Sequence, residues 1–141
     1  MAVEVKIGSK YVGDDHPCYI VAEIGLNHNG KIELAKKLIE TAAECGADAV
    51  KFQKRDIESL LIKELREAPY IKYDSFGATY EEHRRNLELS EDEWYRLFNF
   101  AKKIGIDFYA TPYDFKSADF LDELGVPCFK IASCDVTNLP L

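Results

Sequence analysis

The chain alternates short apolar runs with longer amphipathic stretches, and a glycine or proline stands at most of the boundaries between them. The apolar runs predict four buried strands, at residues 19–23, 49–53, 107–111 and 128–132. Apolar positions at helical spacing predict three helices between the strands, over residues 31–45, 90–104 and 117–124. Strand–helix alternation of this kind predicts an α/β fold with a parallel sheet and right-handed crossovers.

Three other segments carry local signals. Residues 3–12 alternate apolar and charged positions around a glycine turn, which predicts a small N-terminal β-hairpin. Ser90 and Glu93 form a capping-box pattern that sets the start of the second long helix. Residues 138–141 are typical of the start of a further helix.

Composition narrows the class of protein. With 141 residues, 47% of them hydrophobic and 30% charged, the chain is long enough for one modest domain with a packed core. The net charge of −7 argues against a nucleic-acid-binding protein. No apolar run reaches the ~20 residues of a membrane span, and no signal peptide is present, so we expect a cytoplasmic protein. The four cysteines form no CxxC pair, and we expect reduced thiols packed as small hydrophobic residues.

Polar side chains stand at the carboxyl ends of the predicted strands. Lys51 follows one apolar run, Lys130 lies in another, Thr111 ends a third and Glu23 ends the first. The carboxyl ends of parallel strands are where α/β folds hold their ligands, and two lysines with a hydroxyl suit a compact anion. Two other interpretations stay open, in which the lysines pair with carboxylates of the loops or one of them forms a Schiff base.

Four ordered blocks give the chain a specific resemblance, at residues 22–30, 46–53, 110–113 and 129–133. Together they resemble the sialic acid (N-acetylneuraminate) synthase family. The resemblance implies a TIM-type (β/α)8 barrel, which needs ~250 residues. Residues 1–141 would then form its N-terminal part, a half barrel of four strands after the hairpin, without the C-terminal half or an antifreeze-like domain.

The resemblance also implies an activity and a site. Its members condense phosphoenolpyruvate with an N-acetylated hexosamine to give a nine-carbon sialic-type sugar acid. N-acetylmannosamine is the default acceptor, and a 2,4-diacetamido-trideoxyhexose is the nearest alternative. Matching positions for the phosphoenolpyruvate anion are Lys51, Thr111, Lys130 and Ser133. Matching positions for the sugar are Gln53 and, in the first loop, Asn27.

Two carboxylates are the candidate catalytic groups. Glu23 matches the family glutamate of the first strand, and a carboxylate beside a developing cation can stabilise it or transfer a proton. Asp135 stands where the resembling synthases often carry a glutamate. The alternative for Asp135 is a structural one, in which it caps the turn that follows the fourth strand.

The family implies a divalent metal, manganese or magnesium, whose histidine ligands come from later strands and not from this chain. We expect His28 to be a hydrogen-bonding group, and His16 and His83 to be surface or loop residues.

Residues 54–89 form a long charged excursion rich in aromatic side chains, with a short helix predicted over residues 60–67. Within it, Arg84 and Arg85 either line the sugar pocket or lie on a solvated helix face, and the second interpretation is favoured.

Two alternatives to a synthase remain, a class I aldolase and a catalytically silent barrel fragment that acts as an interaction module. We expect the 141 residues alone to be inactive. Their first and fourth strands lack the charges and prolines that protect sheet edges. We therefore expect a homo-oligomer, or pairing with a C-terminal half.

Overall fold

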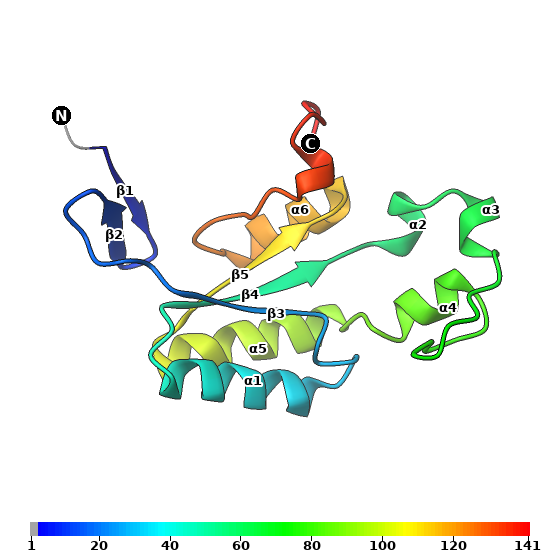
Figure 1. The fold of residues 1–141 in the computed structure, drawn as a ribbon, viewed down its shortest axis with the longest axis horizontal. Coiled ribbons are helices and arrows are strands. Elements are labelled where there is room, and N and C mark those ends of the chain that lie inside the picture. The colour runs from blue at the N-terminus through cyan, green and yellow to red at the C-terminus, as the bar shows by residue number, and fades with distance from the viewer. Residues whose placement is uncertain (1–2) are drawn as a thin grey trace.

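The structure is a computed structural model that describes residues 3–141. Its centre is a parallel sheet of three strands, in the order β3 (Val21–Gly25), β4 (Ala49–Lys54) and β5 (Asp107–Pro112). Helices α1 (Ile32–Glu44) and α5 (Glu91–Ile104) lie side by side along the sheet, and α6 (Phe115–Leu124) packs beside β5 (Figure 1). The predicted α/β class, three of the strands and all three helices are confirmed, with ends shifted by one or two residues.

One aromatic cluster joins the helices to the sheet. Phe52 of β4 stacks on Phe108 of β5 with ring centroids 4.9 Å apart. Trp94 of α5 meets both rings edge-on, at 5.9 and 5.7 Å, and Phe120 of α6 meets Trp94 at 6.2 Å. Because side chains alternate along a strand, burial of Phe52 under the helices places Lys51 on the opposite face of the sheet.

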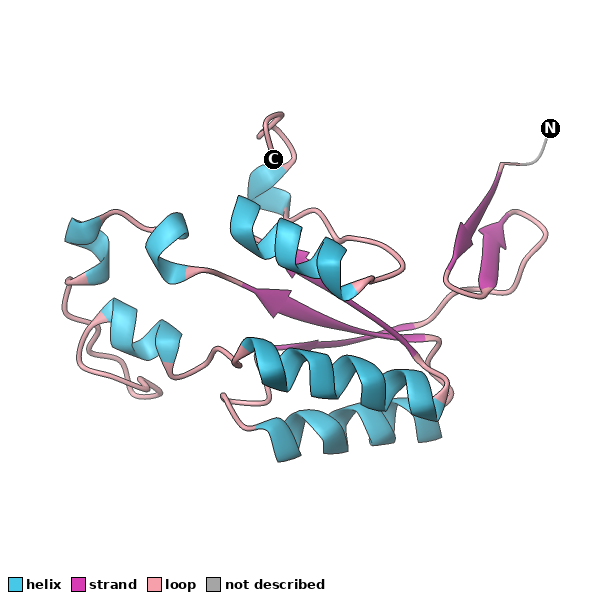
Figure 2. Ribbon diagram, turned by 180° about the vertical axis from the view of Figure 1, so that it is seen from behind, coloured by secondary structure: helices cyan, strands magenta, loops and turns pink. Residues whose placement is uncertain are grey.

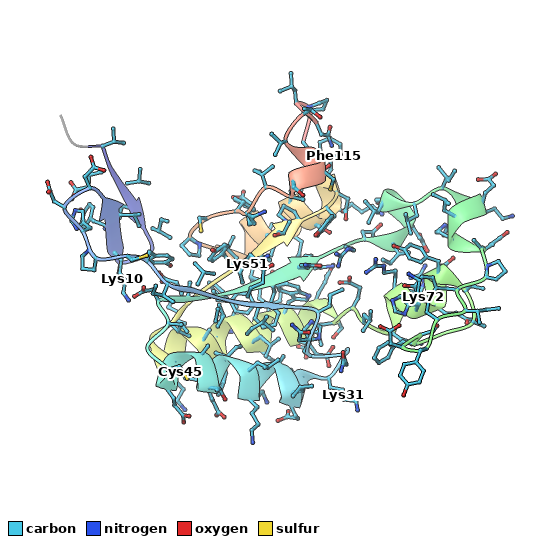
Figure 3. All side chains as sticks on the ribbon, viewed as in Figure 1. Lys10, Lys31, Cys45, Lys51, Lys72 and Phe115 are labelled. Atoms are coloured by element: carbon cyan, nitrogen blue, oxygen red, sulfur yellow. The ribbon has the colours of Figure 1, made fainter. Side chains whose placement is uncertain are left out.

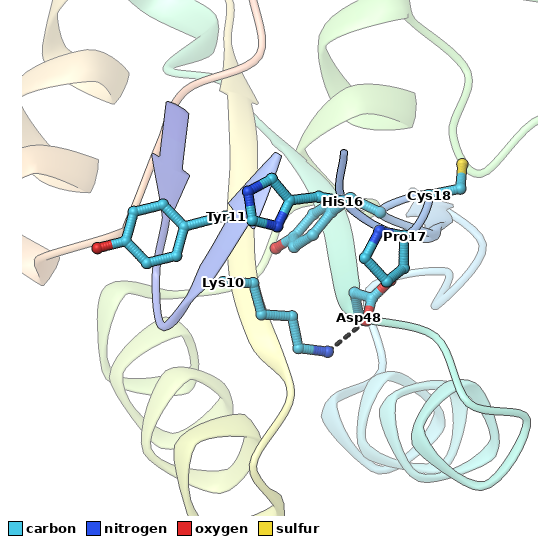
Figure 4. A pocket seen from close by; sticks show the side chains of 7 residues that line it. Lys10, Tyr11, His16, Pro17, Cys18 and Asp48 are labelled. Atoms are coloured by element: carbon cyan, nitrogen blue, oxygen red, sulfur yellow. Dashed lines mark hydrogen bonds and ion pairs between the residues drawn. The ribbon is translucent and has the colours of Figure 1, made fainter. Parts of the chain in front are cut away.

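The N-terminal hairpin is formed as predicted, by β1 (Glu4–Ile7) and β2 (Lys10–Gly13) in antiparallel register. It is fixed to the amino ends of the sheet strands through Asp48, which directly precedes β4. Lys10 forms an ion pair with Asp48, and the backbone N–H of Ile20 donates to the same carboxylate at 2.6 Å (Figure 4). Both contacts hold the pKa of Asp48 below its usual value. The hairpin therefore lies at the end of the sheet opposite to the strand-end side chains.

Helix starts follow their capping side chains. The hydroxyl of Ser90 accepts from the backbone of Glu93, whose carboxylate accepts in return from the backbone of Ser90, so the predicted capping box is confirmed. Helix α6 begins before the predicted residue because Asp114 accepts from the backbone N–H of Ser117 at 2.8 Å.

The excursion after β4 holds three short helices, α2 (Ile57–Leu60), α3 (Lys63–Arg66) and α4 (Tyr80–Arg85), and it projects beyond the carboxyl end of that strand (Figure 2). The short helix predicted over residues 60–67 is confirmed only over residues 63–66, as α3, because the backbone is extended at Leu61 and Ile62. Helix α4 was not predicted, although Thr79 and Glu82 form a capping box at its start.

The fourth predicted strand, residues 128–132, is wrong as a strand. Only one parallel bridge, between Ala110 and Phe129, and the bond from the Lys130 N–H to the Ala110 carbonyl at 3.1 Å tie this segment to β5. No further strand lies beyond it among residues 3–141, so the segment has a hydrogen-bonding neighbour on one side only. A single 3-10 turn (Ser133–Asp135) follows, and the helix predicted over residues 138–141 is not formed.

Burial corrects two other expectations. Three of the four cysteines, Cys18, Cys45 and Cys134, are exposed, and Cys128 is half-buried, so the thiols are free as expected but do not pack in the core. His83 is buried rather than a surface residue. Among residues 3–141, no helix is long and apolar enough to cross a membrane.

Candidate functional site

Three predicted site residues meet at the carboxyl end of the sheet: Glu23, Lys51 and Thr111. The ammonium Nζ of Lys51 lies 2.5 Å from Oε1 of Glu23 on β3 and 3.5 Å from Oγ1 of Thr111 on β5. Strand register explains the first contact, since Glu23 and Lys51 are directly opposite each other. Figure 3 shows Lys51 over the sheet, on the side away from α1 and α5. The sheet thus gathers a cation, a carboxylate and a hydroxyl from three neighbouring strands.

The environment of this cluster is asymmetric. Lys51 and Thr111 are buried, whereas Glu23 is exposed to solvent. A buried ammonium needs compensation by charge or hydrogen bonds, and within residues 3–141 the one carboxylate paired with Lys51 is Glu23. A buried ammonium beside a hydroxyl, with solvent reaching the cluster on the side of Glu23, is an arrangement chemically suited to a compact anion.

Gln53 lies two residues after Lys51, on the same face of β4, and is half-buried. Its amide oxygen accepts from Nη2 of Arg55 at 2.5 Å. Arg55 is buried, lies over the ring of Tyr113 and faces Glu88, whose pKa is raised by burial and lowered in part by Arg55. Arg55 and Glu88 were not among the residues predicted from the sequence, because a charged residue beside a strand carries no local sign of burial.

The predicted residues of the fourth segment do not join this cluster in the structure. Lys130 is exposed, and its ammonium donates to the carbonyl of Ile131 at 2.7 Å. Its backbone is nevertheless bonded to Ala110, the residue before Thr111. Ser133 is exposed in the 3-10 turn. Asp135 accepts from the side chain of Asn138 at 3.3 Å and from the Cys134 thiol at 3.4 Å, so its contacts lie within its own turn but cap no backbone N–H among residues 3–141.

The first loop, between β3 and α1, is held by its own polar groups. Asn27 donates from its side chain to the carbonyl of Ile24 at 2.9 Å. His28 is buried against Phe52, and its Nδ1 accepts from the backbone N–H of Gly30 at 3.2 Å, so it is a hydrogen-bonding group as expected. Burial lowers the pKa of His28 to about 4. Neither side chain contacts Lys51, Glu23 or Thr111.

The two arginines of α4 are engaged within the excursion. Arg85 is exposed and bonds Glu81 and Glu58 at 2.9 and 2.8 Å, as the favoured interpretation of a solvated helix face predicts. Arg84 donates to the hydroxyl of Tyr80 at 2.7 Å, and the same ring lies 6.4 Å from His83.

No group of three or more His, Cys, Asp or Glu side chains among residues 3–141 is arranged to hold a metal ion. The residues that the structure describes therefore do not fit a manganese or magnesium centre by themselves.

A cavity of about 290 Å³ lies at the opposite end of the sheet, under the hairpin. Lys10, Tyr11, His16, Cys18 and Asp48 are among the residues that line it (Figure 4). Lys10, which lines the cavity, is paired with Asp48. None of the site residues predicted from the sequence borders the cavity.

Comparisons with known proteins identify relatives of the chain. Residues 38–141 match the NeuB family. The chain is 48% identical over 131 residues to the N-acetylneuraminate-9-phosphate synthase of Mus musculus and covers 36% of that protein. It is 44% identical over 134 residues to the N,N'-diacetyllegionaminic acid synthase of Legionella pneumophila and covers 38% of it.

A solved structure is similar as well, that of an N-acetylneuraminic acid synthetase from Leptospira borgpetersenii in complex with citrate. The TM-score is 0.79 at 34% identity, over 99% of this chain and 45% of that one. The chain thus spans a little over a third of the length of the curated relatives it matches.

Proposed function

This chain belongs to the NeuB family. We propose that the cluster of Glu23, Lys51 and Thr111 binds phosphoenolpyruvate in the synthesis of a sialic-type sugar acid. The contact of buried Lys51 with Glu23 and Thr111 is the observation that carries the proposal. Phosphoenolpyruvate presents a phosphate and a carboxylate close together, and a lysine ammonium with a hydroxyl donor suits such an anion. Lys130 and Ser133 complete the proposed anion site.

The proposed reaction joins two substrates and water. Carbon C3 of phosphoenolpyruvate attacks the aldehyde carbon of an open-chain N-acetylated hexosamine, which forms the new C–C bond, and the aldehyde oxygen takes up a proton. Positive charge develops at C2, water adds there, and the C–O bond to phosphate then breaks to release inorganic phosphate and the keto acid.

In this scheme Glu23 is the group beside C2. Its carboxylate stabilises the developing cation electrostatically and accepts a proton from the attacking water. Lys51 and Thr111 hold the phosphate until it leaves, and Gln53 contacts the sugar. Asp135 is proposed only as a second carboxylate near the fourth segment, since in this structure it accepts hydrogen bonds within its own turn.

The divalent metal of the family is given no step here, because residues 3–141 hold no group that fits it. Manganese or magnesium, a C-terminal half of the barrel and an N-acetylated hexosamine are the proposed partners of this chain. For the same reason we expect no synthase turnover from the 141 residues alone.

The class I aldolase is the rival enzyme. A Schiff base requires a neutral amine that attacks a carbonyl, whereas Lys51 forms an ion pair with Glu23 at 2.5 Å. In this pair the Lys51 nitrogen acts as a hydrogen-bond donor to an anionic oxygen, as it would towards phosphate, which supports anion binding over covalent catalysis.

The test uses the longest polypeptide that the reading frame of this chain encodes. Phosphate release is measured with phosphoenolpyruvate, manganese and three acceptors: N-acetylmannosamine, its 6-phosphate and a 2,4-diacetamido-trideoxyhexose. We expect release that depends on one acceptor and is lost in Lys51→Met. Borohydride trapping of pyruvate on Lys51 or Lys130, or release that persists in Lys51→Met, would overturn the proposal.

A further inference from the structure

Arg55 occupies an unusual position for a charged residue. It directly follows β4, yet only 8% of its side chain is exposed. Its guanidinium carbon lies 4.1 Å from the ring centroid of Tyr113, and its Nη1 lies 3.6 Å from Oε1 of Glu88. Its other terminal nitrogen, Nη2, donates to Oε1 of Gln53 at 2.5 Å. Stacking on one side and a carboxylate on another thus direct one edge of the guanidinium at Gln53.

This contact fixes which way the Gln53 amide faces. An arginine side chain has donors only, so the amide atom that meets Nη2 must be the oxygen. The amide nitrogen, on the other side of the amide, lies 3.5 Å from where a Cβ would stand at Gly25. Gly25 ends β3, the strand that carries Glu23. Within residues 3–141, no hydrogen bond uses the Nε2 donors of Gln53.

We propose that Arg55 is a positioning residue that turns Gln53 into an obligate hydrogen-bond donor towards the acceptor sugar. This inference rests on the proposed function. The sugar group that fits is an oxygen with free lone pairs, a hydroxyl or the carbonyl oxygen of the N-acetyl group. A glutamine free to flip presents either its oxygen or its amide nitrogen to the sugar, whereas one held by Arg55 keeps its oxygen towards the arginine and presents the nitrogen.

Glu88 is the counter-charge that keeps Arg55 in place. Its side chain is 13% exposed, and among residues 3–141 neither its Oε1 nor Nη1 of Arg55 has a hydrogen-bond partner, so the two face each other as an ion pair at 3.6 Å. Loss of Arg55 alone leaves a buried carboxylate without compensation, which is destabilising. The tests therefore include Arg55→Lys, which keeps the charge but loses the planar fork, and the double variant Arg55→Met/Glu88→Gln, which removes both charges.

The first test is made on the 141-residue chain and does not depend on turnover. The side-chain amide of Gln53 is assigned by ¹⁵N NMR in the parent, in Arg55→Lys and in Arg55→Met/Glu88→Gln. We expect a dispersed amide pair in the parent that moves to the position of a free glutamine in both variants. Arg85→Met is the control, because Arg85 contacts Glu58 and Glu81 instead. An amide pair that is unchanged in both Arg55 variants would overturn the positioning role.

The second test is a double-mutant cycle of Arg55→Lys and Gln53→Met, with steady-state kinetics in the longest polypeptide that the reading frame encodes. We expect each single variant to raise the KM for the acceptor sugar about tenfold, the effect of one lost hydrogen bond to a substrate. The double variant should raise it no further, and the KM for phosphoenolpyruvate should change less than about twofold in all three.

Three results separate the possible failures. Multiplicative effects on the sugar KM, or an unchanged sugar KM in Gln53→Met, would overturn the inference while leaving the proposed function intact. If the longest polypeptide, without substitutions, shows no turnover with any acceptor, the proposed function fails and the sugar assignment fails with it. The NMR measurement still decides whether Arg55 positions Gln53.

Discussion

The ammonium of Lys51 and the carboxylate of Glu23 are in contact, yet the two side chains are buried to opposite extents: 6% of the lysine is exposed and 67% of the glutamate. Loss of the glutamate should therefore cost more free energy of unfolding than loss of the lysine. Without Glu23 the ammonium would stay buried with only the hydroxyl of Thr111 for compensation, whereas without Lys51 the carboxylate would be hydrated by solvent.

The two single substitutions should consequently differ in stability. We expect Glu23→Gln to lower the free energy of unfolding by about 2–4 kcal/mol, as the loss of one partner of a buried charge does. Lys51→Met should change it by less than about 1 kcal/mol, because the lost pair is half-exposed. Urea unfolding followed by the fluorescence of Trp94, the one tryptophan of the chain, measures both. Equal losses in the two variants would contradict the expected difference.

Acid sensitivity is expected from His28. Its pKa is about 4 in the folded chain because it is buried, against 6.5 for the ordinary side chain. Above pH 6.5 the imidazole is neutral in both states and contributes nothing to the pH dependence. As the pH falls from 6.5 to 4, the unfolded state binds the proton first, so the free energy of unfolding falls by up to about 3 kcal/mol.

His28→Asn isolates this contribution, since asparagine keeps an acceptor for the N–H of Gly30 but does not titrate. Urea unfolding between pH 7 and 4.5 should show a smaller loss of stability in His28→Asn than in the parent. Part of the loss will remain, because the pKa of His83 is also lowered by burial. Asn27→Ala, in the same loop, should keep the parental pH dependence. Parallel pH profiles of the parent and His28→Asn would show that the prediction is wrong.

Gly30 ties the first loop to the excursion. It has a φ of +69°, and a Cβ there would lie 2.1 Å from the carbonyl oxygen of Asn86, directly after α4. Gly46 has a φ of +80° but open space around it. We expect Gly46→Ala to cost about 1 kcal/mol of unfolding free energy, for the left-handed backbone alone.

Gly30→Ala should cost about 3 kcal/mol or more, because the clash with Asn86 adds to the same strain. Hydrogen exchange should also show faster opening of α4 in Gly30→Ala than in Gly46→Ala. If the two alanine variants unfold at the same urea concentration, the close approach of Gly30 to Asn86 does not contribute to stability and the prediction is wrong.

The sequence could predict the cluster of Glu23, Lys51 and Thr111 because apolar runs mark the strands, and the carboxyl ends of parallel strands meet at one end of the sheet. The family resemblance drawn from four blocks is confirmed as well. The structure of residues 128–132 was predicted wrongly. Its apolar run reads as a buried strand, but strand formation requires hydrogen-bonding neighbours, and those lie outside any local pattern.

The contact of Arg55 with Glu88 could not be predicted from the sequence for a related reason. The two residues lie 33 positions apart in the sequence and meet only because the excursion returns to the start of α5. A charged residue next to a strand gives no sign of whether it is buried or solvated. Helix α4 differs in this respect, because the capping box of Thr79 and Glu82 is a local pattern from which the start of the helix is predictable.

Self-association remains a prediction, and the structure sharpens it. In the described sheet β3 pairs only with β4, so its outer edge is unpaired, and residues 128–132 are unpaired on their outer side. Ile20 and Ile131, beside these two edges, are each 51% exposed. Unpaired edges with exposed apolar side chains favour pairing with a second copy.

We therefore expect the 141-residue chain to sediment as a dimer or larger species at tens of micromolar. Ile131→Lys should weaken this association, because a charge at a sheet edge opposes pairing through desolvation. Leu65→Lys is the matched control, since Leu65 is similarly exposed but lies on α3, in the excursion and away from both edges. Association that is weakened equally by both substitutions would place the contact outside the sheet edges. A sharp, folded monomer in the parent would show that β3 and the fourth segment tolerate solvent on their open sides.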